Sequence, residues 1–401
     1  MKMRRLSILC VLPLLILTAC SDDPEGTPTG RFVYYVNGDH NGQVEFHRYE
    51  IVSGKDERLS TDHVISLSEV AANGRVLFET RSDAWPYTYQ LFGRCEGGAV
   101  IPVPLPLSSD PAVEFSYVGG DQYGEPLPAA LAHGGHHAAF YAWQRPVGST
   151  DTTEWKLHLC IFDCAAWKMS TTDISAFIEN HFAQQGLGFR PDIPSVTNVL
   201  ALTNDGSVAV ISLIVRQVEN GAPVAWRTLL LGGTPEQLRV LAETSIDTPL
   251  SWFLAAFESS GTLYLIQSDH SGVAYDCRGG SWQVALKSIG RGFQMLSAGS
   301  GEYGRYNSNV QTITLQRVSD GRLHEVPITR TQLETSFPDV QWLHGLSDWG
   351  KLSPDGEWIA FVAQHAADQG LYVIRRDGTG LRRIARGTFD VPPVVSDVVP
   401  Y

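Results

Sequence analysis

The chain has 401 residues, of which 43% are hydrophobic and 18% are charged, and its formal net charge at pH 7 is −13. The charge becomes about −16 when residues 1–19, which carry Lys2, Arg4 and Arg5, are removed. An acidic surface of this kind repels phosphate backbones and disfavours a nucleic-acid partner. Beyond residue 19 no apolar segment approaches the roughly 20 residues that a transmembrane helix requires, so no spanning helix is expected there.

Residues 1–19 have the layout of an export signal: a basic start, an apolar run from Leu6 to Leu17, and small residues before Cys20. The stretch from Leu17 to Cys20 resembles the lipobox of bacterial lipoproteins. This resemblance implies that the Cys20 thiol is lipidated and that residues 1–19 are cut away. Ser21 after the cysteine implies, by the same resemblance, an outer-membrane protein that faces the periplasm. Residues 20–29 are polar and contain Pro and Gly, which predicts a flexible tether.

Residues 30–401 repeat one pattern seven times: a Gly-containing turn, an apolar strand and a further hairpin. The turns contain Gly30, Gly74, Gly135, Gly206, Gly261, Gly301 and Gly356, and the hairpins lie at residues 49–59, 91–102, 159–169, 228–241, 273–284, 312–326 and 371–384. The last copy is the clearest, because Pro354 fixes φ and Gly356 accepts a positive φ in its turn. This copy resembles the repeat of TolB-type propellers. The sequence therefore predicts an all-β protein, a seven-bladed β-propeller with one short helical insertion.

The first copy starts at its turn, with only the polar tether before Gly30, so it lacks an innermost strand. Residues 392–397 resemble the strand and turn that begin a blade, and nothing follows to complete that blade. We expect the end of the chain to supply the missing strand and to close the ring, which removes exposed sheet edges.

The predicted topology gives the propeller two different faces. Turns between first and second and between third and fourth strands lie on one face, and the remaining loops lie on the other. The long segments 105–130, 172–198 and 329–350 fall on that second face. Within residues 173–186 an apolar stripe formed by Ile174, Phe177, Ile178 and Phe182 predicts an amphipathic helix. The helix either covers the apolar ends of the third and fourth blades or forms a lid or docking helix.

Large aromatic side chains on the second face are the candidate contacts for a partner. Trp85 and Tyr87 are expected in one loop, Trp349 in the connection to the last blade, and Phe177 on the helix. Aromatic rings bury much area with few torsions to freeze, which suits an anchor in an interface. The alternative is that these rings pack beneath the loops.

Histidines supply the candidate metal ligands. His40 and His270 lie in similar loops of the first and fifth blades, and His365 lies in the seventh. Oligogalacturonate lyase, a seven-bladed propeller that holds a metal with histidines, offers a loose resemblance, and ordinary turns are the better interpretation. The three histidines within residues 133–137 are expected in an exposed turn. No residue has a pattern that indicates catalysis, and no cofactor is expected.

Cys160 and Cys164 are expected to lie close enough across one hairpin for a disulfide, although both thiols could equally remain free.

The leading interpretation of the whole sequence is a cell-envelope lipoprotein, held by its Cys20 lipid, which binds a protein or an envelope polysaccharide without catalysis. Such binding is what the resemblance to TolB-type propellers implies. The alternatives are a carbohydrate-active or metal-dependent propeller enzyme and a purely structural lipoprotein.

Overall fold

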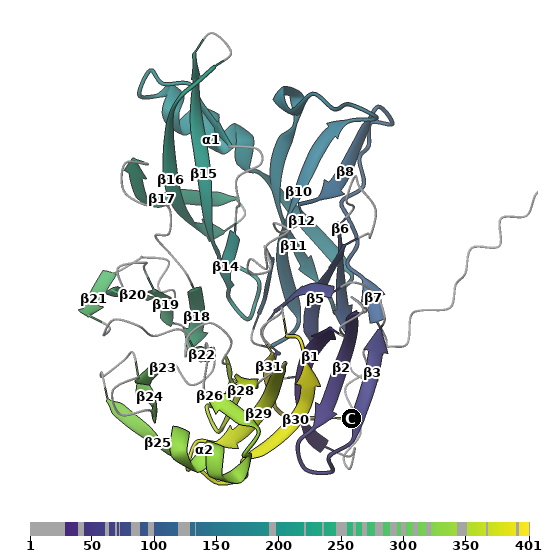
Figure 1. Cartoon of the computed structure of the whole chain (residues 1–401). Helices are drawn as coiled ribbons and strands as arrows, with labels where there is room; N and C mark the ends of the chain where they lie inside the picture. The colour runs from purple at the N-terminus through teal and green to yellow at the C-terminus, as the bar shows by residue number, and fades with distance from the viewer. Residues whose placement is uncertain are drawn as a thin grey trace, which may run out of the picture.

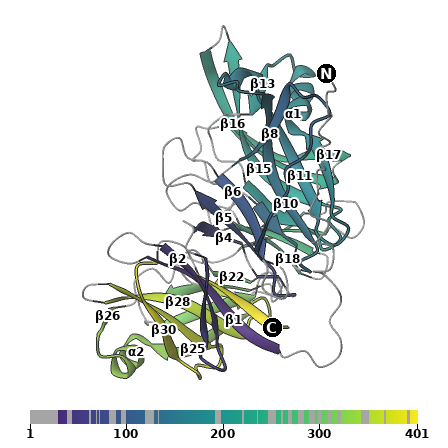
Figure 2. The ribbon, with the colours of Figure 1, turned by 90° about the vertical axis from the view of Figure 1, so that its right-hand side faces the viewer.

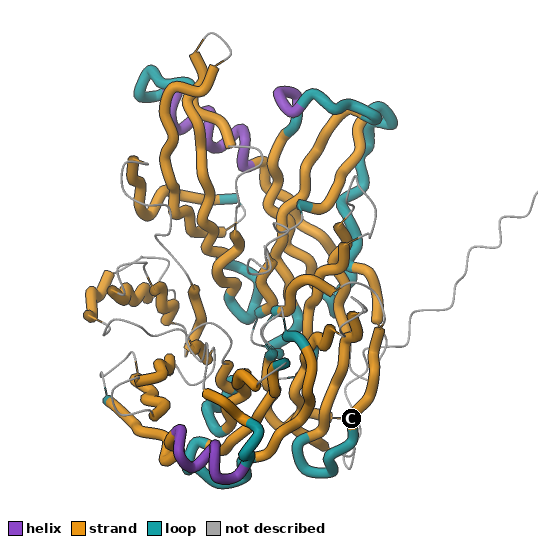
Figure 3. Tube along the Cα trace, viewed as in Figure 1, coloured by secondary structure: helices purple, strands orange, loops and turns teal. Residues whose placement is uncertain are grey.

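The protein, seen in a computed structural model, consists almost entirely of antiparallel β-strands (Figures 1 and 3). The structure describes most of residues 29–400. It does not describe residues 1–28, 39–43, 61–63, 82–88, 95–99, 119–128, 192–197, 343–350, 390–392 and some shorter stretches, and between 246 and 311 it describes only strands. Cys20 and the predicted signal and tether therefore lie outside the described residues.

The described strands form seven antiparallel sheets, named here sheets 1 to 7 in chain order. Sheet 1 contains β1 (Thr29–Gly38), β2 (Val44–Glu50), β3 (Asp56–Ser60) and β31 (Val394–Pro400). Sheet 2 contains β4 (Val64–Leu67), β5 (Val76–Arg81), β6 (Tyr89–Arg94) and β7 (Val100–Pro102). Sheet 3 contains β8 (Val113–Tyr117), β9 (Ala129–Leu131), β10 (His137–Pro146), β11 (Lys156–Asp163) and β12 (Lys168–Asp173).

The remaining sheets follow the same order along the chain. Sheet 4 contains β13 (Phe189–Pro191), β14 (Asn198–Leu202), β15 (Ala209–Glu219), β16 (Ala222–Thr234) and β17 (Gln237–Ser245). Sheet 5 contains β18 (Ala255–Ser259), β19 (Thr262–Ile266), β20 (Ser271–Asp276) and β21 (Val284–Ser288). Sheet 6 contains β22 (Met295–Ser297), β23 (Glu302–Asn307), β24 (Thr312–Arg317) and β25 (Leu323–Thr329). Sheet 7 contains β26 (Val340–Trp342), β27 (Lys351–Leu352), β28 (Trp358–His365), β29 (Gln369–Arg375) and β30 (Arg382–Gly387).

In each sheet the two strands of the predicted hairpin pair with each other, so the all-β class and the seven predicted hairpins are confirmed. The expectation of one helical insertion is wrong, because the described residues contain two α-helices, α1 (Ile174–Ala183) and α2 (Arg330–Ser336), besides a short 3-10 helix at Thr152–Glu154. Leu333 is the one large apolar residue of α2, so this helix has no apolar stripe from which it could be predicted.

The hydrophobic core lies between neighbouring sheets. In the described part of the chain five buried clusters join sheets 6 and 7, 7 and 1, 1 and 2, 2 and 3, and 3 and 4. In the cluster between sheets 1 and 2, for example, the rings of Phe46 and Phe78 lie 4.9 Å apart. Small antiparallel sheets, here of four or five strands, that pack side by side in chain order are the organisation of a β-propeller, so the fold is propeller-like.

Sheet 1 is built from both ends of the described chain. Strand β31 pairs antiparallel with β1, with Val33 opposite Val395 and Tyr34 opposite Val394. The buried hydroxyl of Ser396 accepts a hydrogen bond of 2.8 Å from the backbone N–H of Phe32. The prediction that the chain end supplies the strand missing beside β1 is therefore confirmed.

Four tight turns of the same construction lie at one end of the sheets. In each, a glycine N–H donates to the carbonyl oxygen three residues earlier, and the glycine has a φ of 68–79°. The turns end at Gly74, Gly135, Gly206 and Gly356. We call this end of the molecule the turn face; it also carries the turns that follow β2, β11, β16 and β29. A side chain at these glycines would strain the backbone, which explains the repeated glycine that marks the pattern in the sequence.

Hydrogen bonds cross between neighbouring sheets on the turn face. The guanidinium of Arg31 in sheet 1 donates to the Asp355 carboxylate of sheet 7, at 2.6 and 2.9 Å. Arg75 of sheet 2 donates to the carbonyl oxygen of Gly135 at 2.7 Å, and the N–H of Gly134 in sheet 3 donates to Asn204 of sheet 4 at 2.8 Å. These bonds fix the order in which the sheets lie side by side.

Candidate binding face

The opposite end of the sheets, the loop face, carries the hairpins β10–β11 and β15–β16 and the C-terminal end of β28. In sheets 3, 4 and 7 one long strand pairs along the same edge with two short strands rather than with one. They are β8 and β9 beside β10, β13 and β14 beside β15, and β26 and β27 beside β28. The predicted long segments thus reach the loop face, but each contributes a strand, β8, β13 or β26. These strands supply hydrogen-bond partners for backbone N–H and C=O groups of β10, β15 and β28, which are longer than the other short strands that pair with them.

Sheets 3 and 4 project furthest on the loop face. Strands β15 and β16 have 11 and 13 residues, and Figures 1 and 2 show these strands and β10 reaching the top of the view. Exposed apolar side chains lie at or near the tips: Val147 is 59% exposed, Val224 is 50% exposed and Leu107 is 98% exposed. Leu107 belongs to the connection between β7 and β8, which reaches the tip of β10, because Val147 N–H donates to Ala112 at 2.9 Å.

Helix α1 fills the space between the projecting parts of sheets 3 and 4. It begins after Asp173, whose carboxylate accepts a hydrogen bond of 2.8 Å from Ala176 N–H and caps the helix. Ile174, Ile178 and Phe182 are fully buried in the cluster that also contains Phe189 and residues of β10, β11 and β15. The interpretation that the helix covers the apolar ends of two blades is confirmed. Its apolar stripe is occupied within the protein, which argues against a lid.

Phe177, the candidate partner contact on α1, is half-buried and packs against the same cluster. Its ring is stacked on the His181 ring, with centroids 6.4 Å apart and 7° between the planes. The Phe177 side chain is therefore partly covered by its neighbours and partly accessible to solvent. This geometry combines the two interpretations of Phe177, because the ring packs beneath its neighbours and still lies at the surface.

Charged groups surround the outer end of α1. The guanidinium of Arg227, on β16, lies over the rings of Phe182 and Phe189, 5.5 and 4.9 Å from their centroids. Arg227 also forms an ion pair with Glu243, and His181 Nε2 lies 3.8 Å from the same carboxylate. The sequence gives no signal for this group, because its members lie on three elements that only tertiary packing brings together.

His158 supports the hairpin of β10 and β11 from inside. Its ring is buried, Nε2 lies 2.9 Å from Gln144 Oε1, and the Phe115 ring packs edge-on at 5.4 Å. Burial lowers the pKa of His158, so the imidazole is neutral at pH 7. The projecting hairpin thus has a buried polar support that does not charge near neutral pH.

The other predicted site residues lie mostly outside the described residues. This holds for Cys20, Trp85, Tyr87, Trp349, His40 and His270, whose roles stay predictions. His365 lies at the loop-face end of β28, where its backbone pairs with Val340 of β26. Among the residues that the structure describes, no group of three or more His, Cys, Asp or Glu side chains is placed to hold a metal ion. Within the same residues no helix is long and apolar enough to cross a membrane.

The predicted disulfide between Cys160 and Cys164 is not formed. Cys160 is buried within β11 and Cys164 directly follows the same strand, so the two cysteines do not face each other across a hairpin. Four residues of extended strand separate their Cα atoms by about 13 Å. A disulfide tolerates about 7 Å at most. Burial raises the pKa of the Cys160 thiol, so this side chain behaves as a small apolar group.

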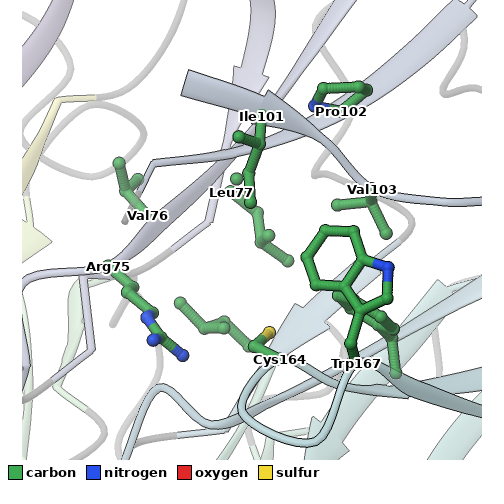
Figure 4. Close-up of a pocket in the computed structure, with 11 residues that line it drawn as sticks. Arg75, Val76, Leu77, Ile101, Pro102, Val103, Cys164 and Trp167 are labelled. Carbon is green, nitrogen blue, oxygen red and sulfur yellow. The ribbon is translucent and has the colours of Figure 1, made fainter. Parts of the chain in front are cut away.

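A small cavity lies between sheets 2 and 3 (Figure 4). Its walls include Leu77, Val103, Phe162, Cys164 and Trp167, and its volume is about 30 Å³. Figure 4 shows the Trp167 ring beside Val103 and Cys164 near the centre of the lining. A space of this size and apolar character holds no more than a water-sized molecule. The cavity is therefore a packing gap rather than a ligand site.

The prediction of an exposed histidine turn before β10 is confirmed for His136, whereas His137 is partly buried. His136 is exposed in the turn, and His137 Nδ1 lies 3.0 Å from the Asn204 carbonyl oxygen of sheet 4. His133 lies outside the described residues. These contacts give His137 a structural role between sheets.

No protein-family model matches this sequence, and no curated protein matches it. Solved structures with a similar arrangement include TolB from Acinetobacter baumannii, with a TM-score of 0.42, 12% identity, and coverage of 93% of this chain and 69% of TolB. A putative 6-phosphogluconolactonase from Bacteroides fragilis gives a TM-score of 0.46 and 11% identity over 94% of this chain and 100% of that chain. The β-propeller domain of the Trilobed protease from Pyrococcus furiosus gives 0.42 and 9% identity over 81% and 84%. With TM-scores below 0.5, these similarities carry no conclusion about function.

Proposed function

We propose that this chain is a cell-envelope lipoprotein, anchored through Cys20, whose seven sheets form a closed propeller that binds a protein or an envelope polysaccharide on its loop face. Binding occurs without catalysis, and the lipid holds the protein in the outer membrane with the propeller in the periplasm. The export signal, the lipobox resemblance and the pairing of β31 with β1 support this proposal.

The observation that carries the binding function is the projecting pair of hairpins on the loop face. Val147, Val224 and Leu107 are exposed apolar side chains at or near the tips of the projecting hairpins, and these hairpins pack against α1. Exposed apolar groups on a rigid support are typical of interaction sites, because little conformational entropy is lost when a partner covers them. The sequence predicts that the candidate aromatic anchors Trp85, Tyr87 and Trp349 also lie in loops of this face.

A metal-dependent or carbohydrate-active enzyme is the second candidate. One observation favours it: His365 lies at the loop-face end of β28. The sequence predicts that the loops of His40 and His270 lie on the same face. Titration with Zn²⁺ tests this candidate. Binding that is lost in His40→Ala, His270→Ala and His365→Ala alike would favour the enzyme over the non-catalytic binder. A purely structural lipoprotein would show neither metal binding nor a partner.

Photocrosslinking in intact cell envelopes tests the binding proposal. A benzoylphenylalanine at Val147 or at Val224 is expected to give one discrete adduct with a protein or a polysaccharide. The same group at Val52, on the turn face, serves as the matched control and is expected not to give that adduct. The same adduct from all three positions, or from Val52 alone, contradicts a partner site on the loop face.

Substitutions identify the anchors of that site. Val147→Asp, Val224→Asp, Trp85→Ala and Trp349→Ala are each expected to weaken the adduct or its capture several-fold, whereas Arg278→Ala leaves it unchanged. Cys20→Ala is expected to move the protein from the membrane fraction to the soluble fraction. Retention of Cys20→Ala in the membrane fraction contradicts the lipid anchor.

A further inference from the structure

Exposed apolar side chains also occur on the turn face, at matching places in four sheets. Val52 lies between β2 and β3, Val100 begins β7, Trp167 lies between β11 and β12, and Leu323 begins β25. Their exposed fractions are 79%, 38%, 56% and 58%. Each marks the turn between the third and fourth strands of its sheet, so together they follow the outer rim of the turn face. We call these four residues the apolar rim.

Trp167 is the most unusual member of the apolar rim. Its φ is 53°, the left-handed conformation that bulky residues avoid, yet more than half of its large side chain is in water. The Phe162 ring contacts it edge-on at 5.0 Å and holds it in place. Strained backbone that keeps an aromatic ring at the surface is typical of a functional contact.

Contacts between turns place part of the apolar rim beside the start of the folded chain. His324, next to Leu323, has its Nε2 3.1 Å from the Arg376 carbonyl oxygen of sheet 7. Arg382 of sheet 7 donates to the Ile51 carbonyl oxygen of sheet 1, next to Val52. Ile51 N–H in turn donates to Arg31 at 2.8 Å, two residues after β1 begins at Thr29. Val52 is therefore adjacent to the point where the chain enters the fold.

The length of chain before β1 limits how far this face can lie from a lipid at Cys20. Nine residues lead from Cys20 to Thr29. Fully extended, they span about 32 Å at most. Because β1 begins on the turn face, a tether of this length allows that face to reach the membrane surface.

Charge on the turn face is arranged around the apolar rim. Exposed Lys55, Lys168 and Arg322 each lie within three residues of a rim side chain. Asp355 on this face is paired with Arg31, and the exposed carboxylates of Asp56, Asp377 and Glu325 lie on the same face. Apolar and aromatic side chains beside lysine or arginine are typical of surfaces that rest in the interface of a bilayer.

We infer that the turn face docks on the lipid bilayer. The apolar rim enters the interfacial region, and Lys55, Lys168 and Arg322 meet the headgroup phosphates. This inference rests on the lipid anchor of the proposed function and adds an orientation to it, with the binding hairpins directed away from the membrane. A single lipid tether alone would leave the propeller free to rotate. Contact through the apolar rim keeps the turn face against the membrane.

Lipid photocrosslinking tests the orientation. The acylated full chain is incorporated into vesicles of phosphatidylethanolamine and phosphatidylcholine that contain a radiolabelled phospholipid, with benzoylphenylalanine at Val52, Trp167 or Leu323. Each position is expected to give at least ten times more lipid adduct than the matched exposed positions Val147 and Val224. Similar adducts from both sets, or more from the loop face, overturn the inference.

Incorporation of labelled palmitate at Cys20 tests the lipid anchor separately from the orientation. An unlabelled Cys20 overturns the anchor and the orientation together. A labelled Cys20 with equal lipid adducts on both faces leaves the anchor intact and overturns the orientation alone. Protein adducts from Val52, Trp167 and Leu323 in envelopes, without lipid adducts, would show that the rim contacts a protein instead.

Discussion

The turn face and the loop face cap opposite ends of the same sheets but are held together by different forces. On the turn face, polar side chains such as Arg31, Arg75 and Asn204 join neighbouring sheets through hydrogen bonds. On the loop face of sheets 3 and 4, the contact is made by buried apolar side chains of α1 and the long strands. The directional bonds set the order and spacing of the sheets, whereas the apolar packing supports surfaces that project beyond them.

The largest effect is expected from removing the seam, by which we mean the pairing of β31 with β1 that joins the two ends of the described chain. Deletion of residues 391–401 removes β31, leaves the backbone groups of β1 unpaired and exposes the buried side chains around Val394 and Val395. The loss is roughly 5 kcal/mol or more, enough to abolish cooperative unfolding. Thermal melting followed by circular dichroism measures it. A truncated protein that melts within about two degrees of the full chain contradicts the seam.

The next largest effect is expected beneath α1. Phe182→Ala leaves a cavity in the cluster between sheets 3 and 4, and it should lower the free energy of unfolding by about 3–5 kcal/mol. Phe177→Ala, at a half-buried position on the same helix, is the matched control and should cost about 1 kcal/mol. Urea denaturation compares the two. Equal losses would show that the helix lies on the surface rather than between the sheets.

A smaller effect is expected when a glycine of the turn face is replaced by alanine, which adds a methyl group. Gly206 has a φ of 68°, and a Cβ there would lie 2.4 Å from the His137 ring of sheet 3. Gly206→Ala should therefore cost about 2–3 kcal/mol, from backbone strain and from displacement of that ring. Gly148 has a φ of 73° with nothing within 4 Å of such a Cβ, so Gly148→Ala should show the strain alone, about 1 kcal/mol. Similar costs for both variants contradict close packing between these turns.

The smallest effect concerns the ion pair beside the seam. Burial opposes ionisation of Asp355, but hydrogen bonds from Arg31, Ser353 and Glu357 N–H outweigh it and lower the pKa of the carboxyl group below its ordinary 3.8. The stabilisation is therefore complete above the unfolded pKa near 3.8 and is lost as the pH falls toward the folded value. Asp355→Asn should cost about 1 kcal/mol at pH 7 and less at pH 3. Urea denaturation at both pH values measures this difference, and an equal cost at both contradicts a charged Asp355.

Local signals were sufficient to predict the repeating part of the fold. Glycine turns before apolar strands predicted the hairpins. The apolar stripe predicted the helix at residues 174–183, and the unpaired strand pattern at the chain end predicted the seam at Val394. Strands β8, β13 and β26 could not, because each is short and forms only where a long second strand offers unpaired backbone. The error at Cys160 has a similar origin: where a strand ends decides whether two cysteines face each other, and strand ends are the least certain part of a sequence pattern.

The candidate site was less accessible to sequence reasoning than the fold. Large aromatic residues drew attention to Trp85 and Trp349, whereas the described tips of the loop face carry the smaller Val147 and Val224. Valine is usually buried, so residue type alone does not distinguish Val147, in the turn after β10, or Val224, in β16, from a core valine. The group around Arg227 also depends on tertiary contacts among β16, β17 and α1.

The pairing of β1 with β31 has a consequence for the time at which this protein can fold. The hydrogen bond between Phe32 and Ser396 joins residues 364 positions apart. At typical synthesis rates about 20 to 70 s pass between the appearance of the first and the second. During that interval β1 has an open edge that can pair with another chain. A chain that emerges N-terminus first therefore needs either a chaperone at this edge or an unfolded sheet 1 until its last strand has emerged.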